Sequence, residues 1–318
     1  MAIEGRHLIT GSTFDDIYQD LLWTVNNNPQ HVCSPRGSKI KENLAVTLVL
    51  SNPRARLLSC VKRNTNYGFA VGEFLWYWNG KRDLETMLYY NKRMKDYSDD
   101  GETLNSAYGY RLKVENAQFI NPKGQWSTAI HTLVKDPDSR RAVLHINRAS
   151  DQLVADIEGS SDVPCTLSLQ FFIRDNRLDL HVHMRSNDIM WGLTYDLFSF
   201  TLFQECMLLE LKEWEKFKDL KLGKYYHTAG SLHIYEKHFD QASEICMEYG
   251  LGVDYKQPQE PLVSLEDLDK VSDVEKVLRL KQGPLFVSGS IEGTELWMID
   301  ELKHHRAKRD LEALNKKE

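Results

Sequence analysis

The sequence contains no apolar run of the roughly 18 residues that a membrane-spanning helix needs. Its first ten residues also lack the apolar core of a secretory signal peptide. Only five cysteines occur in 318 residues, with no C-x-x-C pair and no zinc-like spacing, so neither a disulfide framework nor a structural metal site is expected. Together these absences predict a cytoplasmic protein with reduced cysteines.

An excess of positive charge is also absent. The 46 acidic residues outnumber the 40 basic residues and give a net charge of -6, so we do not expect whole-protein attraction to nucleic acid or to an anionic membrane. The apolar fraction of 42% and the charged fraction of 27% are typical of an ordinary globular protein. Any anion that this protein binds must therefore meet a local cluster of arginine side chains.

Linkers and repeats are missing as well. No Gly-, Ser- or Pro-rich stretch separates two halves of the chain, which predicts one α+β domain over residues 1–318. From Val271 onward the sequence becomes mixed and highly charged. We therefore expect residues 271–318 to form a charged C-terminal extension of that domain.

Apolar periodicity and turn signals predict the main elements. Helices are expected over 13–27, 70–79, 128–135 and 197–211, and strands over 43–51, 142–147, 166–173 and 178–185. The last two strands are joined by Asp175-Asn176, which is typical of a hairpin turn. In the irregular stretch before the first strand, Pro35 and Gly37 flank Arg36, so this arginine is expected on a loop that can close on an anion.

A cysteine and an arginine are predicted to meet at one end of the hairpin. Cys165 precedes the first of its strands, and Arg185 ends the second. A guanidinium beside a thiol lowers the thiol pKa and favours the nucleophilic thiolate. Spacing alone leaves open the alternative that Cys165 is simply a small buried residue.

A single carboxylate, Glu73, lies within the very apolar helix predicted over 70–79. Apolar surroundings disfavour the ionised form and raise the pKa of a carboxyl group, which suits proton transfer near neutral pH. Glu73 is therefore a candidate catalytic residue rather than a solvent-facing helix residue.

Several short motifs resemble those of thymidylate synthase in order and spacing. They are DPDSRR (136–141), VPC (163–165) followed by Gln170-Phe171, RSND (185–188) leading to Gly192-Leu193, and the flanking segments EFLW (73–76) and HIY (233–235). The resemblance covers roughly residues 73–240. It implies a large mixed β-sheet flanked by helices, with the sheet packing at a homodimer interface.

The resemblance also implies substrates and residue roles. The substrate would be a pyrimidine nucleotide monophosphate, and the one-carbon donor would be the folate 5,10-methylenetetrahydrofolate. Cys165 would be the nucleophile that adds to C6 of the pyrimidine, and Glu73 would organise water and move protons near the base. The implied phosphate contacts are Arg36, Arg185, Ser186, Arg140 and Arg141, and the last two would reach across a homodimer. His233 and Tyr235 would contact the ribose. Asp188 and Trp76 would contact the folate.

The position that reads the base departs from the family pattern. Thymidylate synthase has Gly-Leu-Pro-Phe-Asn where this chain has GLTYD (192–196), so Asp196 replaces the asparagine that reads uracil. A carboxylate cannot donate to O4 of uracil, but it accepts from the N4 amino group of cytosine and, when protonated, donates to N3. We therefore expect CMP or dCMP as the substrate, as in the cytidylate 5-hydroxymethylase branch, with Asp196 recognising and helping to protonate the base.

Two further departures favour hydroxymethylation. First, Thr166 stands where many synthases have a histidine after the nucleophile. Second, the C-terminus has no recognisable Ala-Pro-Val-Ala-type tail that would close over the folate. If water reaches the exocyclic methylene, the product is 5-hydroxymethyl rather than 5-methyl. The alternatives are a C5-methylating enzyme that acts on uridylate or cytidylate, and a catalytically silent nucleotide- or RNA-binding regulator; ribose and deoxyribose both remain open.

Overall fold

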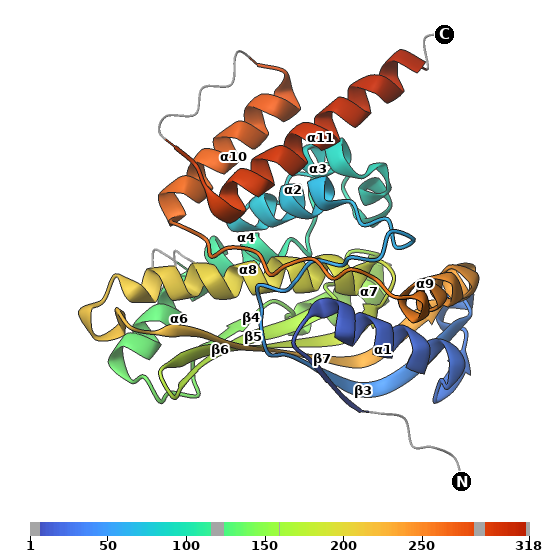
Figure 1. Ribbon diagram of the computed structural model, residues 1–318, viewed down its shortest axis with the longest axis horizontal. Helices are drawn as coiled ribbons and strands as arrows, with labels where there is room; N and C mark the ends of the chain where they lie inside the picture. Colours follow the sequence, from blue (N-terminus) through green and yellow to red (C-terminus); the bar gives the residue numbers. More distant parts are fainter. Residues whose placement is uncertain (1–6, 116–123, 159, 283–289, 316–318) are drawn as a thin grey trace.

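A computed structural model describes residues 7–115, 124–158, 160–282 and 290–315 (Figure 1). Residues 283–289 and 316–318 of the expected extension lie outside the described part. The strands are β1 (Leu8–Gly11), β2 (His31–Cys33), β3 (Ile40–Leu50), β4 (Val143–His145), β5 (Thr166–Arg174), β6 (Arg177–Asp188) and β7 (Lys221–Tyr235). The α-helices are α1 (Phe14–Asn27), α2 (Tyr67–Trp78), α3 (Leu84–Tyr90), α4 (Tyr108–Lys113), α6 (Gly124–Lys135), α7 (Ala149–Glu158), α8 (Gly192–Lys212), α9 (Phe239–Leu251), α10 (Leu265–Leu280) and α11 (Gly293–Asn315).

The described strands form one mixed sheet in the order β1-β3-β7-β6-β5-β4, with β2 paired to β3 outside that path. The pairs β1/β3 and β6/β7 are parallel, and the other neighbours are antiparallel. This arrangement confirms the expected α+β class with a large mixed sheet. It also brings the ends of β6 and β7, which carry several candidate site residues, side by side.

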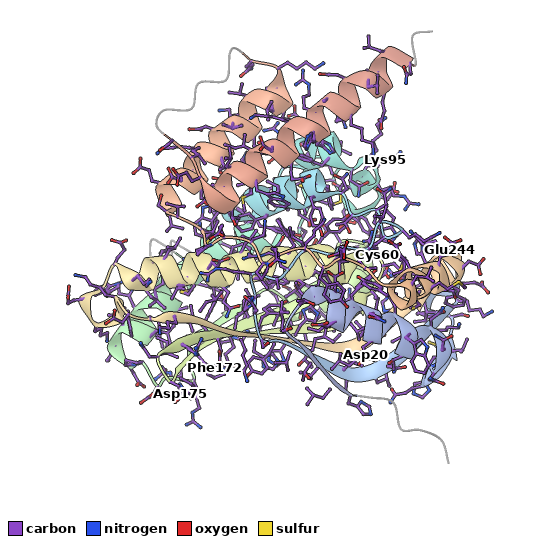
Figure 2. All side chains as sticks on the ribbon, viewed as in Figure 1. Asp20, Cys60, Lys95, Phe172, Asp175 and Glu244 are labelled. Carbon is purple, nitrogen blue, oxygen red and sulfur yellow. The ribbon has the colours of Figure 1, made fainter. Side chains whose placement is uncertain are left out.

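The β5–β6 hairpin forms as the sequence predicts. Its two turn residues, Asp175 and Asn176, have φ angles of 49° and 54°, which are the left-handed values that a two-residue type I′ hairpin turn requires. Figure 2 labels Asp175 at the tip of this hairpin. At the other end, the Arg185 amide donates to the Cys165 carbonyl over 2.9 Å. The predicted meeting of the cysteine and the arginine is therefore confirmed.

Helix α8 covers one face of the sheet (Figure 1). Most of its residues are buried, because the sheet lies below it and α2 and α6 pack against it from other sides. A helix that is buried on nearly all sides needs an apolar surface all round, which explains the long apolar run in its sequence. No described helix is long and apolar enough to span a membrane.

The opposite face of the sheet has no helix over it among the described residues (Figure 1). Side chains on this face are only half-buried; they include His181, Tyr226 and Thr228, and also Phe172, which Figure 2 labels near the hairpin. The His181 Nε2 atom lies 2.8 Å from the Thr228 hydroxyl, so part of this face forms polar contacts of its own. This face therefore carries both polar and aromatic side chains, which are half-buried.

The charged C-terminal part forms a helical hairpin. Helices α10 and α11 pack on each other, and α11 also packs along α2 (Figure 1). The expected boundary at Val271 falls inside α10, which begins at Leu265 after the N-cap Ser264. The described part of the extension therefore continues the helical layer above the sheet.

Most predicted elements are present with shifted ends. Helix α2 begins at Tyr67 because the Asn66 side chain accepts the Phe69 amide at 3.0 Å and caps it. Strand β3 begins at Ile40 rather than at residue 43, because it pairs there with the end of β7. Arg36 lies in the short 3₁₀ turn η1 (Pro35–Gly37) with a φ angle of 50°, which confirms the loop around it. The irregular stretch expected over 28–42 also contains strand β2 and the start of β3, so its two ends are wrong.

Candidate active site

A cavity of about 1160 Å³ opens where β6, β7, α2 and α8 come together. Its walls also include η1, the segment before β5 and part of α11. Pockets for one drug-sized ligand are typically about 300–1,000 Å³, so this cavity is large enough for two ligands side by side. Its polar lining indicates that the ligands carry charged or hydrogen-bonding groups.

Most of the residues singled out in the sequence line this cavity. They are Arg36, Glu73, Trp76, Cys165, Arg185, Ser186, Asp188, Asp196, His233 and Tyr235. The two exceptions, Arg140 and Arg141, lie on an exposed turn before β4 and do not line it. The fold thus brings together side chains from five separate stretches of sequence.

Hydrogen bonds fix Cys165 at the entrance to β5. The Arg185 guanidinium donates to the carbonyls of Pro164 and Val163, each over 3.0 Å. On the preceding side, the Asp162 carboxylate accepts the amides of Asn105 and Ser106. The segment that carries the thiol is therefore tied to two neighbouring parts of the chain.

The expected lowering of the Cys165 pKa is wrong for the free protein. Burial raises the pKa of this thiol, and the nearby Asp196 carboxyl acts in the same direction. Arg185 and Arg36 oppose these effects without outweighing them. The guanidinium does lower the thiol pKa, but the desolvation that burial causes has the larger effect.

Asp196 is the fifth residue of α8, and its half-buried side chain lines the cavity. Burial raises its pKa from 3.8 to about 7, and a hydrogen bond from Asn187 opposes that rise. The Asn187 Nδ2 atom donates to Asp196 Oδ2 over 2.7 Å. The carboxyl group therefore changes protonation near neutral pH, with one of its oxygens held by an amide.

The same amide offers a second polar atom to the site. The Oδ1 atom of Asn187 is buried and has no hydrogen-bond partner among the described residues. A buried unpaired acceptor is costly, so such an atom favours a ligand that supplies a hydrogen. Asn187 and Asp196 together form one polar end of the cavity.

Glu73 behaves as its apolar surroundings predict. Burial, together with the charge of Asp196, raises its pKa from 4.5 to about 8. Tyr77 lies one helical turn later on the same side of α2 and lines the same cavity. The Tyr77 ring stacks on that of Tyr108, with centroids 5.1 Å apart and an interplanar angle of 10°. A carboxyl group and two phenols thus surround one part of the cavity.

A second cluster lies at the end of β7. Arg36 lines the cavity beside Tyr235, and its charge opposes the burial that raises the pKa of that tyrosine. Arg36 and Arg185 both act on the pKa of Cys165, so the two guanidinium groups lie on the thiol side of the cavity. Two arginines near one opening suit a dianionic group such as a phosphate.

Trp76 contributes little exposed surface to the cavity. Its side chain is 2% exposed, and its indole N–H donates to the Asp83 carbonyl over 3.1 Å. Asp188 lines the cavity more openly, with one carboxylate oxygen accepting the Met190 amide over 2.9 Å. The aromatic surface near the opening comes instead from Trp191, which the sequence argument did not select; it is 43% exposed.

Several other lining residues were not selected from the sequence. Asn187 and Tyr77 lie next to selected residues in the sequence or along a helix, so a helical-spacing argument from Glu73 would have found Tyr77. The residues from α11 carried no such signal; they are Glu301, His304, His305 and Lys308. Their part in the cavity follows only from how α11 packs on α2.

Comparison with known proteins agrees with this geometry. The family described as thymidylate synthase matches residues 16–271. The deoxyuridylate hydroxymethyltransferase of Bacillus phage SP01 is 35% identical over 274 residues, covering 84% of this chain and 68% of that protein. The protein of the same name from Pseudomonas phage M6 is 37% identical over 148 residues, covering 46% and 40%.

Relatives with the synthase name are more distant in sequence. The thymidylate synthase of Bacillus licheniformis is 26% identical over 240 residues, covering 74% of this chain and 78% of that protein. Among solved structures, the thermostable thymidylate synthase A from Bacillus subtilis has a TM-score of 0.60 at 20% identity, covering 78% of this chain and 87% of that one. This structural likeness confirms the expected fold.

The family match and the similar relatives identify a one-carbon transferase that acts on a pyrimidine nucleotide, and the fold and the cavity agree with it. This chain belongs to the thymidylate synthase family. Its co-substrate is 5,10-methylenetetrahydrofolate, which the family uses to supply the one-carbon unit. The size of the cavity, the arginines near its thiol and the polar groups around Asp196 all fit a nucleotide and a folate bound together.

Proposed function

We propose that this enzyme converts cytidylate, either CMP or dCMP, into its 5-hydroxymethyl derivative. The observation that carries the proposal is the half-buried Asp196 carboxyl in the cavity, at the position to which the family resemblance assigns base recognition. Its pKa of about 7 makes both of its protonation states available at neutral pH. In the protonated state it can donate to N3 of cytosine while its other oxygen accepts from the N4 amino group.

Asn187 supports the same choice of base. It holds one oxygen of Asp196 through its Nδ2 atom, while its own Oδ1 atom remains an unpaired acceptor beside it. The N4 amino group of cytosine has two hydrogens, whereas O4 of uracil has none. An acceptor pair formed by Asp196 and Asn187 therefore matches cytosine better than uracil.

A second candidate substrate is dUMP. It is favoured by the names of the two phage relatives, which are both deoxyuridylate hydroxymethyltransferases. The protonated Asp196 carboxyl is also able to donate to O4 and accept from N3–H of uracil. The two substrates differ in basicity, since N3 of cytosine attracts a proton far more strongly than O4 of uracil does, so ionisation of Asp196 penalises uracil more.

In this proposal Cys165 provides covalent catalysis. Its thiolate adds to C6 of the pyrimidine, which makes C5 a carbon nucleophile able to take up the one-carbon unit. Arg36 and Arg185 would bind the phosphate, with Ser186 beside them. Substrate binding also changes the pKa of the Cys165 thiol. A cytidylate phosphate neutralises the arginine charge that lowers this pKa, and protonation of Asp196 removes the negative charge that raises it.

The hydroxymethyl outcome requires that tetrahydrofolate leaves and C5 loses its proton, which gives an exocyclic methylene, and that water then adds to this methylene. Glu73, with a pKa of about 8, is able to accept a proton from a water molecule that attacks the exocyclic methylene. Tyr77 and Tyr108 line the same part of the cavity and supply hydroxyl groups for holding that water. Water then adds its oxygen to the methylene carbon, and departure of the Cys165 sulfur restores the aromatic pyrimidine.

The remaining roles complete the substrate sites. His233 and Tyr235, at the end of β7, would contact the ribose hydroxyls, and Asp188 with Trp76 would lie on the folate side. Arg140 and Arg141 would bind the phosphate held by the other subunit of a homodimer. Their exposed position outside the cavity supports this role, and so does the sheet face that no described helix covers.

The base preference is tested by comparing the native enzyme with Asp196→Asn on dCMP, CMP and dUMP. Loss of one buried hydrogen bond costs about 1–3 kcal/mol, so the ratio of kcat/KM for cytosine over uracil should fall about tenfold or more in the variant. Cys165→Ala is the matched control; it should bind nucleotide but show no turnover. An unchanged base ratio in Asp196→Asn would refute the recognition argument, and turnover by Cys165→Ala would refute the nucleophile.

A further inference from the structure

Asp162 is a buried carboxylate in the wall of the cavity, and it has no role in the reaction described above. It is 3% exposed, lines the cavity and precedes the nucleophile Cys165 by three residues. One of its oxygens accepts the Asn105 amide, and the other accepts the Ser106 amide over 3.0 Å. Burial raises the pKa of this carboxyl, and these hydrogen bonds oppose that rise. Asp162 therefore links the segment before the thiol to a distant part of the sequence.

That distant part leads directly into Tyr108. Helix α4 begins at Tyr108, and its N-cap, Ala107, provides no side-chain hydrogen bond. The turn before the helix is held instead by Asp162 and by Arg111, which donates to the Asn105 carbonyl over 2.8 Å. Because Arg111 belongs to α4, it holds the turn to its own helix, whereas Asp162 holds the turn to the segment that carries the thiol.

The thiol and the phenol belong to two walls of the cavity that are each anchored elsewhere. Arg185 donates to two carbonyls of the thiol segment over 3.0 Å, and the Tyr108 ring stacks on that of Tyr77. The two reacting sides are close, because Cys165 acts on the pKa of Tyr108 and Asp162 acts on that of Tyr77. A misplacement of about 1 Å can cost about a hundredfold in rate, so the spacing between these walls matters to the reaction.

We propose that Asp162 is a positioning residue that sets the spacing between the Cys165 thiol and the Tyr108 phenol, so that both reach one pyrimidine ring. The inference rests on the proposed function, because it assumes that the thiol adds to C6 and that Tyr108 helps to hold the water that reacts beside C5. Other residues contact the phosphate and the ribose. Loss of Asp162 should therefore slow the steps after substrate binding and leave the affinity for the nucleotide nearly unchanged.

The test compares the native enzyme with Asp162→Asn, which keeps the size of the side chain but places an amino group against a backbone N–H. With dCMP, or with whichever nucleotide the native enzyme converts, kcat should fall about tenfold to a hundredfold, while KM for the nucleotide stays within about twofold. Asp99→Asn is the matched control. Asp99 is exposed outside the cavity and joins neighbouring parts of the same segments, because it accepts the Ser160 hydroxyl and the Ser161 amide. This variant should keep the native kcat.

Active-site titration separates positioning from a merely structural role. A dCMP or dUMP with fluorine at C5 has no C5 proton to lose, so the reaction stops as a covalent complex of Cys165, nucleotide and folate that counts the competent sites. Asp162→Asn should titrate nearly as fully as the native enzyme, with a lower kcat per titrated site.

A titrated fraction that falls in step with kcat, an unchanged kcat, or equal effects of the two variants would overturn the inference. A methylated product, or reaction with dUMP alone, would refute only the proposed function, because kcat is compared for whichever nucleotide reacts. Absence of turnover by the native enzyme with all of these nucleotides would refute both proposals.

Discussion

At the residue scale, the central feature is a pair of half-buried carboxyl groups, Asp196 and Glu73. Burial raises the pKa of Asp196 to about 7, and burial with the charge of Asp196 raises that of Glu73 to about 8. A negative charge on Asp196 disfavours ionisation of Glu73, so the two carboxyl groups lose their protons at different pH values. This property suits a reaction in which the base must be protonated and water must lose a proton.

The same burial makes the ionised Asp196 carboxyl lower the free energy of unfolding. In the folded state its pKa is about 7 rather than 3.8, so between these pH values the folded protein holds a proton that the unfolded chain has lost. Stability therefore falls as the pH rises through this window, and the loss persists above it. Asp196→Asn should raise the free energy of unfolding, by up to about 4 kcal/mol at pH 8, since one pKa unit corresponds to about 1.4 kcal/mol.

Urea unfolding at about pH 5 and about pH 8 checks this prediction, with a smaller gain expected at the lower pH. A gain of the same size at both pH values would show that ionisation of Asp196 does not lower the stability of the folded protein. No gain at either pH would mean that the carboxyl is better solvated than its position in the cavity indicates.

The pKa shift of a single residue was predictable where neighbouring residues in the sequence cause it. The raised pKa of Glu73 follows from the apolar helix around it, which the sequence displays. The sign of the Cys165 shift was wrong, because the depth of burial depends on the whole fold. The contact between Asn187 and Asp196 was missed for a related reason: it forms only when the end of β6 meets the start of α8.

At the scale of elements, the packing of α4 on α2 determines where Tyr77 and Tyr108 lie. Gly109, the second residue of α4, approaches α2 so closely that an added Cβ atom would lie 1.7 Å from the Tyr77 carbonyl oxygen. Backbone contact of this kind leaves no side chain free to move aside. The stacked tyrosines therefore depend on a glycine at this position.

Gly109→Ala should push α4 away from α2, with a loss of stability of about 1–3 kcal/mol or more and a lower kcat. Gly250→Ala serves as the control, because Gly250 lies in α9 with open space around its Cβ position. That variant should be as stable as the native protein or more stable by about 0.5–1 kcal/mol. Thermal unfolding and steady-state rates measure both effects, and equal behaviour of the two variants would contradict the packing argument.

Elements were predictable where a local pattern specified them. The β5–β6 hairpin has both alternating strands and the Asp175-Asn176 turn, and its position was confirmed. The earlier start of β3 was not visible in the sequence, because residues 40–42 are in strand conformation through their pairing with β7 and β2, which lie elsewhere in the chain. The hairpin of α10 and α11 was not predicted either, since its charged sequence gives little indication of which face packs on α2.

At the scale of the whole molecule, the sheet has one face without a covering helix among the described residues. His181 and Tyr226 on that face are half-buried, and the Arg140–Arg141 turn is exposed. A second copy packed on this face would shield it and bring these arginines to the partner's cavity. The family resemblance suggested this assembly, and the single chain offers the exposed groups that it requires.

A mixing experiment tests the shared site. A variant with both Arg140→Ala and Arg141→Ala and the variant Cys165→Ala should each be nearly inactive alone. After subunit exchange, random pairing gives mixed dimers with one intact site each, so activity should recover to about a quarter of the native value. Size-exclusion chromatography verifies the dimers, and no recovery despite exchange would contradict contribution of these arginines across the interface.

The central claim is that the enzyme hydroxymethylates a cytosine nucleotide. Mass spectrometry of CMP, dCMP and dUMP, each incubated with the enzyme and 5,10-methylenetetrahydrofolate, tests it most directly. The account predicts a gain of one CH₂O unit on CMP or dCMP, with the reacting nucleotide identifying the sugar. A gain of one CH₂ unit, or reaction with dUMP alone, would contradict the role given to Asp196.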